Sequence, residues 1–186
     1  MFVSKKQKRS FILITILSVV FFQPVLFSYA GDKTIEIKSS AFENNDTIPK
    51  LFTCDGRDIS PPIMWDSIPE NTQSLALICD DPDAPMGTWV HWVIYNIRPI
   101  PKELPAKILS QEKTPFEARQ GINDFGKIGY GGPCPPTGTH RYFFKLYALD
   151  TKLNLEGKIT KEKLLAAMKN HILAQAELIG RYQRQR

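Results

Sequence analysis

The prolines constrain this chain more than any other residue type. The chain has 186 residues and 14 prolines, and thirteen of the prolines lie between Pro49 and Pro136. Proline has a fixed φ and no backbone N–H, so it interrupts helices and is excluded from the centre of a sheet. Only short apolar runs lie between the prolines, and one late segment has helical spacing. These features favour a loop-rich, mainly β body.

Four short segments have the pattern of β-strands. Residues 35–38 alternate between apolar and charged side chains, which is typical of a half-buried strand. Residues 75–79 form a continuous apolar run and predict a buried strand. Residues 89–97 and 142–149 are rich in aromatic and β-branched side chains, which favour strands.

The last part of the chain predicts an amphipathic helix. Apolar side chains fall at helical spacing after Thr160, and Gly180 is a natural end for the helix. They are Leu164, Leu165, Met168, Ile172, Leu173 and Ala176. No repeat or linker divides residues 31–186, which predicts a single domain. The expected fold is a mainly β, antiparallel β-sandwich with a C-terminal α-helix packed against it.

Residues 1–30 have the features of a signal peptide. A basic segment at residues 5–9 precedes a twelve-residue, mostly apolar stretch at residues 11–22. Small residues at Ser28 and Ala30 fit a cleavage site. The stretch is short for a membrane span of about 20 residues, and its extension to Phe27, which includes Gln23 and Pro24, is the alternative of an uncleaved anchor. The sequence therefore predicts a periplasmic or secreted protein that begins at Gly31.

The charge of the chain lies mainly in that N-terminal segment. The whole chain carries a net charge of +5, but residues 31–186 hold 20 basic and 19 acidic side chains. A nearly neutral body has no general attraction for nucleic acid. Nucleic acid is therefore not an expected partner.

Three cysteines leave at least one thiol unpaired within a monomer. Cys79 ends an apolar run and is expected as a buried thiol. Cys54 and Cys134 lie in loops rich in proline and glycine, where they could pair or remain two thiols. No spacing of cysteine and histidine indicates a zinc site, and no cofactor or metal is predicted.

Polar groups follow or interrupt the apolar strands in three places. Residues 80–85 (DDPDAP) follow the first buried run. His91 stands in an otherwise apolar strand, and residues 129–136 (GYGGPCPP) lead to His140. His171 lies beside the apolar stripe of the expected helix and is expected to be structural.

These segments together resemble the phosphatidylethanolamine-binding protein family. The similar segments are residues 81–85 (DPDAP), 89–92 (WVHW) and 138–142 (GTHRY). Residues 121–126 (GINDFG) and 129–136 are similar to its bacterial YbhB/YbcL, Raf-kinase-inhibitor-like branch. The resemblance covers nearly all of residues 35–182. It implies a small antiparallel β-sandwich with a shallow anion pocket at one end.

The resemblance also implies which residues line that pocket. The residues that match the family's pocket are Asp81, His91, His140, Tyr142, Gly132 and Cys134, with Asp83 at the pocket edge or in a turn. Gly132 and Cys134 are expected to offer backbone N–H groups. The family's eukaryotic members usually carry glycine at the position of Cys134, so their partners are not transferred to this chain.

Elementary chemistry supports an anion site at these residues. An aspartate beside two imidazoles is expected to raise their pKa values and to favour their protonated forms. Protonated histidine donates from both nitrogens, to Asp81 and to a ligand oxygen. Trp89, Trp92 and Tyr142 are expected to form apolar walls. Arg141 alternates away from His140 and is expected in a structural ion pair.

The predicted function is a non-catalytic binding protein for a small phosphorylated or other anionic ligand. One alternative is a protein-interaction module, either a protease inhibitor or a secreted effector, that uses residues 98–129 as its contact surface. A second alternative is a metal- or histidine-dependent hydrolase built on Asp81, His91 and His140. The resemblance also allows a homodimer.

Overall fold

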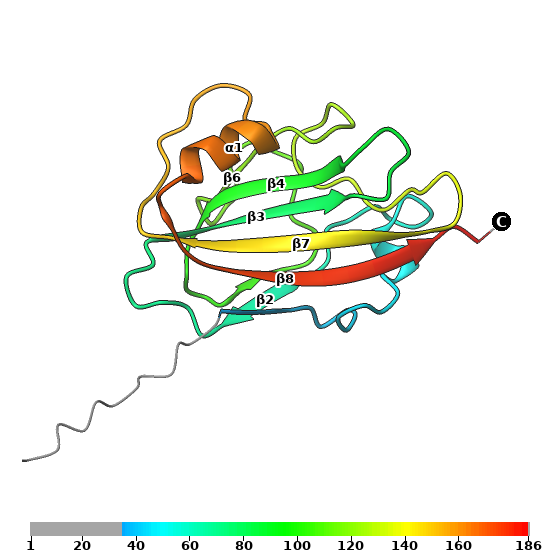
Figure 1. The fold of residues 1–186 in the computed structure, drawn as a ribbon, viewed down its shortest axis with the longest axis horizontal. Helices are drawn as coiled ribbons and strands as arrows, with labels where there is room; N and C mark the ends of the chain where they lie inside the picture. The colour runs from blue at the N-terminus through cyan, green and yellow to red at the C-terminus, as the bar shows by residue number, and fades with distance from the viewer. Residues whose placement is uncertain (1–34, 186) are drawn as a thin grey trace, which may run out of the picture. The chain divides into compact units, whose positions relative to one another are not determined.

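A computed structural model describes residues 35–185, and it consists mainly of antiparallel strands. The predicted signal peptide at residues 1–30 lies outside the described residues. The small sheet has the order β1-β2-β5. The large sheet has the order β6-β4-β3-β7-β8 (Figure 1). The strands of the small sheet are β1 (Glu36–Lys38), β2 (Ile63–Asp66) and β5 (Glu103–Leu104). The strands of the large sheet are β3 (Ser74–Asp81), β4 (Trp89–Ile97), β6 (Arg119–Gln120), β7 (Thr139–Leu149) and β8 (Ile172–Gln183).

Two layers of apolar packing explain why residues 75–79 of β3 are apolar on both faces of the strand. One face of β3 presents Leu75, Leu77 and Cys79 to the core that the two sheets share. Its other face presents Ala76 and Ile78 to a second apolar cluster. Because both faces are covered, every residue of β3 is buried.

Helix α1 (Lys161–Met168) covers the outer face of the large sheet (Figure 1). Its buried side chains are Leu164 and Met168, which belong to the second apolar cluster. The Thr160 hydroxyl caps the helix by accepting from the Lys163 N–H. The mainly β architecture with one packed helix is therefore confirmed.

The predicted extent of the helix is wrong. The chain leaves the helix after Met168, turns at Asn170 with a φ of 69°, and continues as β8. From Ala174 onward, alternate side chains are more buried, which is the period of a strand. Pairing with β7 over eleven registered residues outweighs the local helical spacing. His171 lies in the turn, where its Nδ1 is 2.8 Å from Asp150 Oδ1.

The stretch at residues 98–129, the contact surface of the interaction-module alternative, contains two short strands. It contributes β5 to the small sheet and β6 to the large sheet. Buried Gln120 holds this segment in place, since it accepts from Trp92 Nε1 and donates to the carbonyls of Leu109 and Gln111. A short 3-10 helix, η1 (Lys50–Phe52), precedes the loop that contains Cys54.

Candidate functional site

A cavity of about 330 Å³ lies at one end of the large sheet, where β3 ends and β4 and β7 begin. Three strands and three loops contribute its walls. The lining residues are Asp81, Ala84, Pro85, Met86, Trp89, His91, Phe125, Cys134, Pro135, Pro136, His140 and Tyr142. Asp81, His91, Cys134, His140 and Tyr142, five of the residues that the resemblance implied, therefore meet in one place.

Asp81 and His140 form a buried pair in this cavity. The distance from His140 Nδ1 to Asp81 Oδ2 is 2.7 Å, and their side chains are 8% and 4% exposed. The other carboxylate oxygen, Oδ1, accepts from the Asp83 N–H at 2.8 Å. A carboxylate only accepts here, so the Nδ1 atom of His140 carries the hydrogen and Nε2 remains available to a ligand.

A β-bulge places His91 in the same cavity. Cys79 of β3 pairs with Trp92 of β4, whereas the next residue, Asp80, pairs with Val90. His91 is thus the extra residue of β4, and a bulge re-aims the side chain that it carries. Val90 and Val93 contact the outer cluster, so the bulge leaves both His91 and Trp92 on the inner side.

The His91 imidazole is held by the backbone. Its Nδ1 lies 2.6 Å from the Gly131 carbonyl oxygen, which can only accept, so Nδ1 carries the hydrogen. The Gly131 N–H donates in return to the His91 carbonyl. Burial lowers the pKa of His91 below its ordinary value of 6.5, although Gly131 and Asp81 oppose the shift. The expectation of a raised pKa at His91 is therefore wrong, because desolvation outweighs the nearby carboxylate.

Aromatic rings enclose the imidazole of His91. Phe125 and Tyr142 contact it edge-on, with ring centroids 5.3 and 5.1 Å away. Trp89 packs edge-on against Phe125. Trp92 does not reach the cavity as expected, because its ring packs on Tyr130 and its N–H is bound by Gln120.

Two polar groups of the aromatic wall donate no hydrogen bond to the described residues. They are the Tyr142 hydroxyl and Trp89 Nε1, and both are buried. Burial raises the pKa of Tyr142 far above its ordinary value, so its hydroxyl keeps its proton. A buried donor without a partner costs free energy, which a ligand that accepts from it can recover.

Phe125 is a cavity residue that the sequence did not predict. The Asn123 side chain fixes its loop, since Oδ1 accepts from the N–H groups of Phe125 and Lys127. Asn123 also donates from Nδ2 to the Gly129 carbonyl. An Asn-Asp before glycine predicts such a turn, but only the tertiary fold places its phenyl ring on His91.

The loop at residues 131–134 has a structural role beyond the one expected. The Gly132 N–H, expected to face an anion, donates instead to Asp58 Oδ1 at 2.6 Å. Cys134 lines the cavity and forms a disulfide with Cys54, which decides between the two alternatives left by the sequence. Cys79 is a buried thiol, as predicted, and burial raises its pKa.

Asp83 lies outside the cavity lining, in an ion pair with Arg141. Both of its carboxylate oxygens accept from the Arg141 guanidinium, and Oδ2 also accepts from the Arg141 N–H. These bonds lower the pKa of Asp83 to about 2. Arg141 thus forms the structural ion pair expected of it, and Asp83 secures the loop after β3.

The cavity does not present a metal centre within residues 35–185. No group of three or more His, Cys, Asp or Glu side chains there is arranged to hold a metal ion.

No helix within residues 35–185 is long and apolar enough to cross a membrane.

Comparison with known proteins gives consistent matches. The family model described as phosphatidylethanolamine-binding protein matches residues 38–183. A protein named UPF0098 protein from Methanothermobacter thermautotrophicus is 52% identical over 150 residues, which are 81% of this chain and 99% of that protein. A UPF0098 protein from Aquifex aeolicus is 49% identical over 86% of this chain and 94% of its own length.

Two crystal structures are similar to the described fold. A phosphatidylethanolamine-binding protein homologue from Chlamydia trachomatis has a TM-score of 0.76 and 42% identity, covering 82% of this chain and 99% of its own. YbcL of Escherichia coli has a TM-score of 0.75 and 31% identity, covering 81% of this chain and 99% of its own.

Proposed function

This chain belongs to the phosphatidylethanolamine-binding protein family, and from that premise we propose that it binds a small oxyanion, such as a phosphomonoester, between His91 and His140. One observation carries the proposal. Both buried imidazoles are anchored through Nδ1, to Gly131 and to Asp81, and both line one cavity of about 330 Å³. Each ring therefore has its Nε2 left for a ligand.

The two imidazoles differ in what they offer. His91, with its lowered pKa, is neutral at pH 7, so its Nε2 accepts a hydrogen bond. His140 donates Nδ1–H to Asp81, and a proton brought to its Nε2 with the ligand would face an anionic oxygen. A ligand with one anionic oxygen and one O–H group complements this pair, and a phosphomonoester monoanion has both.

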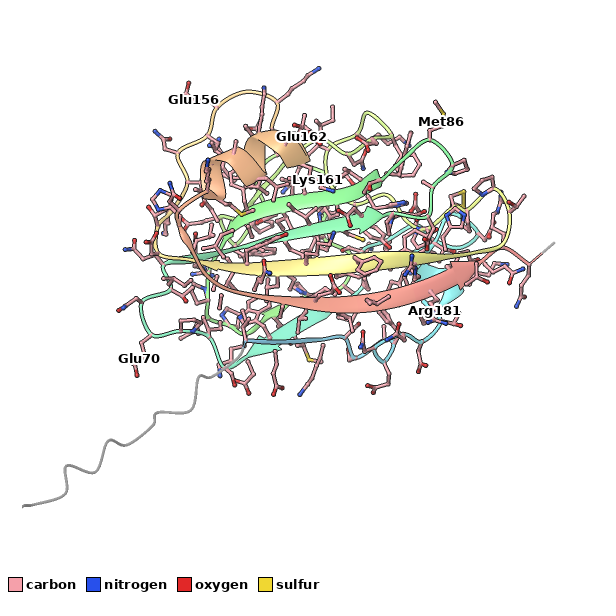
Figure 2. The ribbon with its side chains drawn as sticks, viewed as in Figure 1. Glu70, Met86, Glu156, Lys161, Glu162 and Arg181 are labelled. Carbon is pink, nitrogen blue, oxygen red and sulfur yellow. A yellow bond between two sulfur atoms is a disulfide. The ribbon has the colours of Figure 1, made fainter. Side chains whose placement is uncertain are left out.

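Other groups of the cavity limit the ligand further. The Tyr142 hydroxyl, which donates to no group among residues 35–185, adds a neutral donor. No lysine or arginine is among the lining residues, so no fixed cation balances a dianion. The Phe125 ring and Met86 line the cavity and supply apolar surface. Met86 is 96% exposed and projects from the loop between β3 and β4 (Figure 2). These features favour a singly charged group attached to an apolar or neutral body.

We propose binding rather than catalysis at this site. The described lining residues include no serine or threonine hydroxyl, and Cys134 is occupied by its disulfide. The Asp81–His140 pair alone, without a nucleophile beside it, supports a role in holding a proton toward a ligand.

The experiment is a histidine NMR titration with phosphate and phosphoethanolamine. We expect saturable shifts of the ring signals of His91 and His140 and none at His171. The variant His140→Gln should abolish saturation. The control is His171→Gln, because His171 pairs with Asp150 in a similar contact far along the chain from the cavity residues. Unshifted His91 and His140 signals, with the fold intact, contradict the proposal.

We further propose that the domain is exported and functions in the periplasm or outside the cell. The Cys54–Cys134 disulfide supports this, since disulfides persist in oxidising compartments. The family model begins at residue 38, so the signal-peptide features precede the matched domain. N-terminal sequencing of protein from fractionated cells should give Gly31 as the first residue. Recovery of the uncleaved chain in the cytoplasmic fraction contradicts the proposal.

A further inference from the structure

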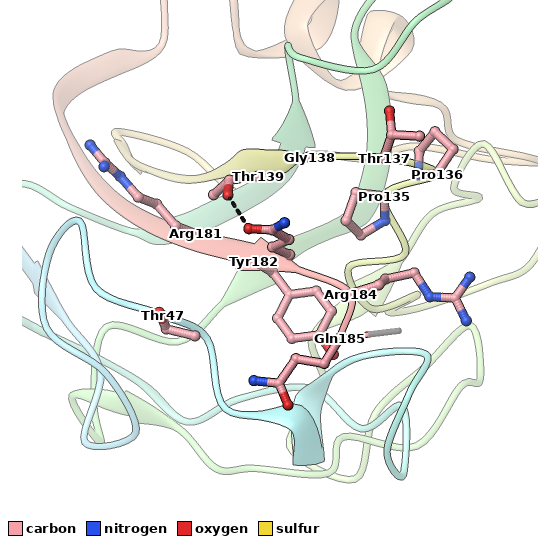
Figure 3. A pocket seen from close by; sticks show the side chains of 11 residues that line it. Thr47, Pro135, Pro136, Thr137, Gly138, Thr139, Arg181, Tyr182, Arg184 and Gln185 are labelled. Carbon is pink, nitrogen blue, oxygen red and sulfur yellow. Dashed lines mark hydrogen bonds between the residues drawn. The ribbon is translucent and has the colours of Figure 1, made fainter.

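A second cavity, of about 770 Å³, lies where β8 ends and β7 begins (Figure 3). It shares only Pro135 and Pro136 with the cavity that contains His91 and His140. Its walls carry hydroxyl and amide side chains, including those of Thr47, Thr139 and Gln183. Two guanidinium groups line it and, among the described residues, no carboxylate does. The wall is thus polar and positively charged.

Arg181 is the uncompensated charge of this wall. It pairs in register with Arg141 across β7 and β8, so the two cationic side chains lie on the same face of the sheet. Asp83 neutralises Arg141 through a bidentate ion pair. Within the part of the chain that the structure describes, the Arg181 guanidinium hydrogen-bonds only to the neutral Asn45 Oδ1, at 3.5 Å, the outer limit of a hydrogen bond. Because Asp83 already compensates Arg141, Arg181 is left without a carboxylate partner among residues 35–185, and a bound anion would supply one.

The second guanidinium has a different role. Arg184 binds the Asp55 carboxylate from Nε and Nη2, and the Tyr182 hydroxyl donates to the same carboxylate. Asp55 adjoins Cys54, whose disulfide to Cys134 fixes the chain that leads into Pro135 and Pro136. Side-chain bonds and a covalent link therefore hold two walls of the cavity. A cavity held in this way is preorganised for a ligand.

We infer that this cavity is a second binding site, and that it takes an acidic sugar, a polyhydroxylated ligand with one carboxylate. The planar guanidinium of Arg181 suits a carboxylate, which it binds with two parallel N–H donors. Gln183 Oε1 already accepts from the Thr139 hydroxyl, so its amide N–H₂ remains for sugar hydroxyls. The volume lies within the range of small-ligand sites and far exceeds that of a bare anion.

The test titrates the protein with glucuronate and follows backbone amide signals by NMR. We expect saturable shifts at Thr47, Thr139 and Gln183, with His91 and His140 unmoved. Glucose, which lacks the carboxylate, should bind at least about tenfold more weakly, a loss of about 1.4 kcal/mol. Arg181→Gln should weaken glucuronate binding by a similar factor, whereas Arg98→Gln, a change at an exposed arginine outside the cavity, should not.

Several outcomes overturn the inference. Equal affinity for glucose and glucuronate would show that the carboxylate does not contribute to binding. Unchanged glucuronate affinity in Arg181→Gln, with a wild-type spectrum elsewhere, would show that the guanidinium does not contribute. Shifts confined to His91 and His140 assign glucuronate to the other cavity. Because phosphate at His91 and His140 is measured separately, either site can fail while the other is retained.

Discussion

The His91 imidazole lies where its charged form is disfavoured. His91 is 2% exposed, and its Nδ1–H already donates to the Gly131 carbonyl. The unfolded chain takes up a proton on this ring near pH 6.5, whereas the folded chain takes it up at a lower pH. Below pH 6.5 the unfolded state therefore binds more protons, and acid favours unfolding until the folded-state pKa is reached.

This linkage predicts a pH-dependent stability that depends on His91. Between pH 6.5 and the lowered pKa, the free energy of unfolding should fall by up to about 1.4 kcal/mol per pH unit from this group. The variant His91→Gln should show a shallower fall over the same range, measured by urea unfolding at a series of pH values. His171→Gln, a change outside the cavity, should retain the wild-type slope. A wild-type slope in His91→Gln would assign the effect to another group.

Gly132 is predicted to tolerate no side chain. A Cβ there would lie 2.5 Å from the Phe52 carbonyl oxygen and 2.6 Å from Asp58 Oδ1. Because one of these neighbours is backbone, Gly132→Ala should move the loop at residues 131–134 and cost about 1–3 kcal/mol. Thermal unfolding measures the loss, with exposed Thr137→Ala as the control. An unchanged melting temperature in Gly132→Ala would contradict the close packing.

For individual residues, the sequence indicated which side chains line the cavity, but not their pKa values or hydrogen-bond partners. Asp81, His91 and His140 lie in one cavity, as the resemblance implied. The direction of the His91 pKa depended on burial, which local sequence does not report. The glycine-rich segment suggested N–H donors, but the Gly132 N–H is bound to Asp58, a residue 74 positions away. A contact of that sequence separation leaves no local pattern.

Among the elements, α1 is tied to the sheet by a buried charge cluster. Asp80 of β3 is fully buried and accepts from the ammonium groups of Lys145 on β7 and Lys161 at the start of α1. The side chains of Lys145 and Lys161 are 33% and 19% exposed. The lysines can therefore reach water if Asp80 is removed, whereas Asp80 cannot if the lysines are removed.

This asymmetry predicts unequal losses of stability. The double variant Lys145→Met, Lys161→Met leaves an uncompensated buried carboxylate and should cost about 3–5 kcal/mol. Asp80→Asn leaves two lysines with access to solvent and should cost less. Chemical denaturation compares the two variants, and hydrogen exchange should show faster exchange in α1 for the double variant. Equal losses would contradict the dominant role of carboxylate desolvation.

The element that the sequence misassigned is β8. Leu164, Met168, Ile172 and Ala176 are four residues apart, so the helical pattern continues through the true end of the helix. The same segment also alternates from Ala174 to Tyr182, and the pairing with β7 decides between the two periods. Pairing of two strands is a tertiary interaction, and here it outweighs the local helical pattern of the segment.

For the whole molecule, the Cys54–Cys134 disulfide joins two loops separated by 80 residues. Cross-linking a long loop reduces the conformational entropy of the unfolded chain. The free energy of unfolding typically rises by about 2–4 kcal/mol as a result. The double variant Cys54→Ser, Cys134→Ser should lose stability of that order in urea unfolding. Wild type in a thiol reductant should match the double variant, and the reductant should not destabilise the variant further. Equal stability of oxidised wild type and the variant would contradict a stabilising role.

The predicted architecture of residues 35–185 is confirmed, but the strand order cannot be derived from the sequence. Short β runs separated by prolines predicted a mainly β sandwich with a packed helix. The order β6-β4-β3-β7-β8 brings segments that are distant in sequence together, such as Gln120 beside Ile94. The apolar run at residues 75–79 predicted that β3 is buried, but the neighbours that bury it, β4 and β7, follow from that order.

The bulge at His91 means that the site is encoded partly in the length of a strand. Cys79 and Asp80 are adjacent, whereas their partners Trp92 and Val90 are two residues apart. Deleting His91 would restore regular alternation in β4 and leave Asp81, His140 and Tyr142 unchanged. Relatives that differ by one residue in this strand would then share most of the cavity's side chains yet differ in what it binds. In comparing such relatives, insertions and deletions near His91 carry as much information about specificity as substitutions do.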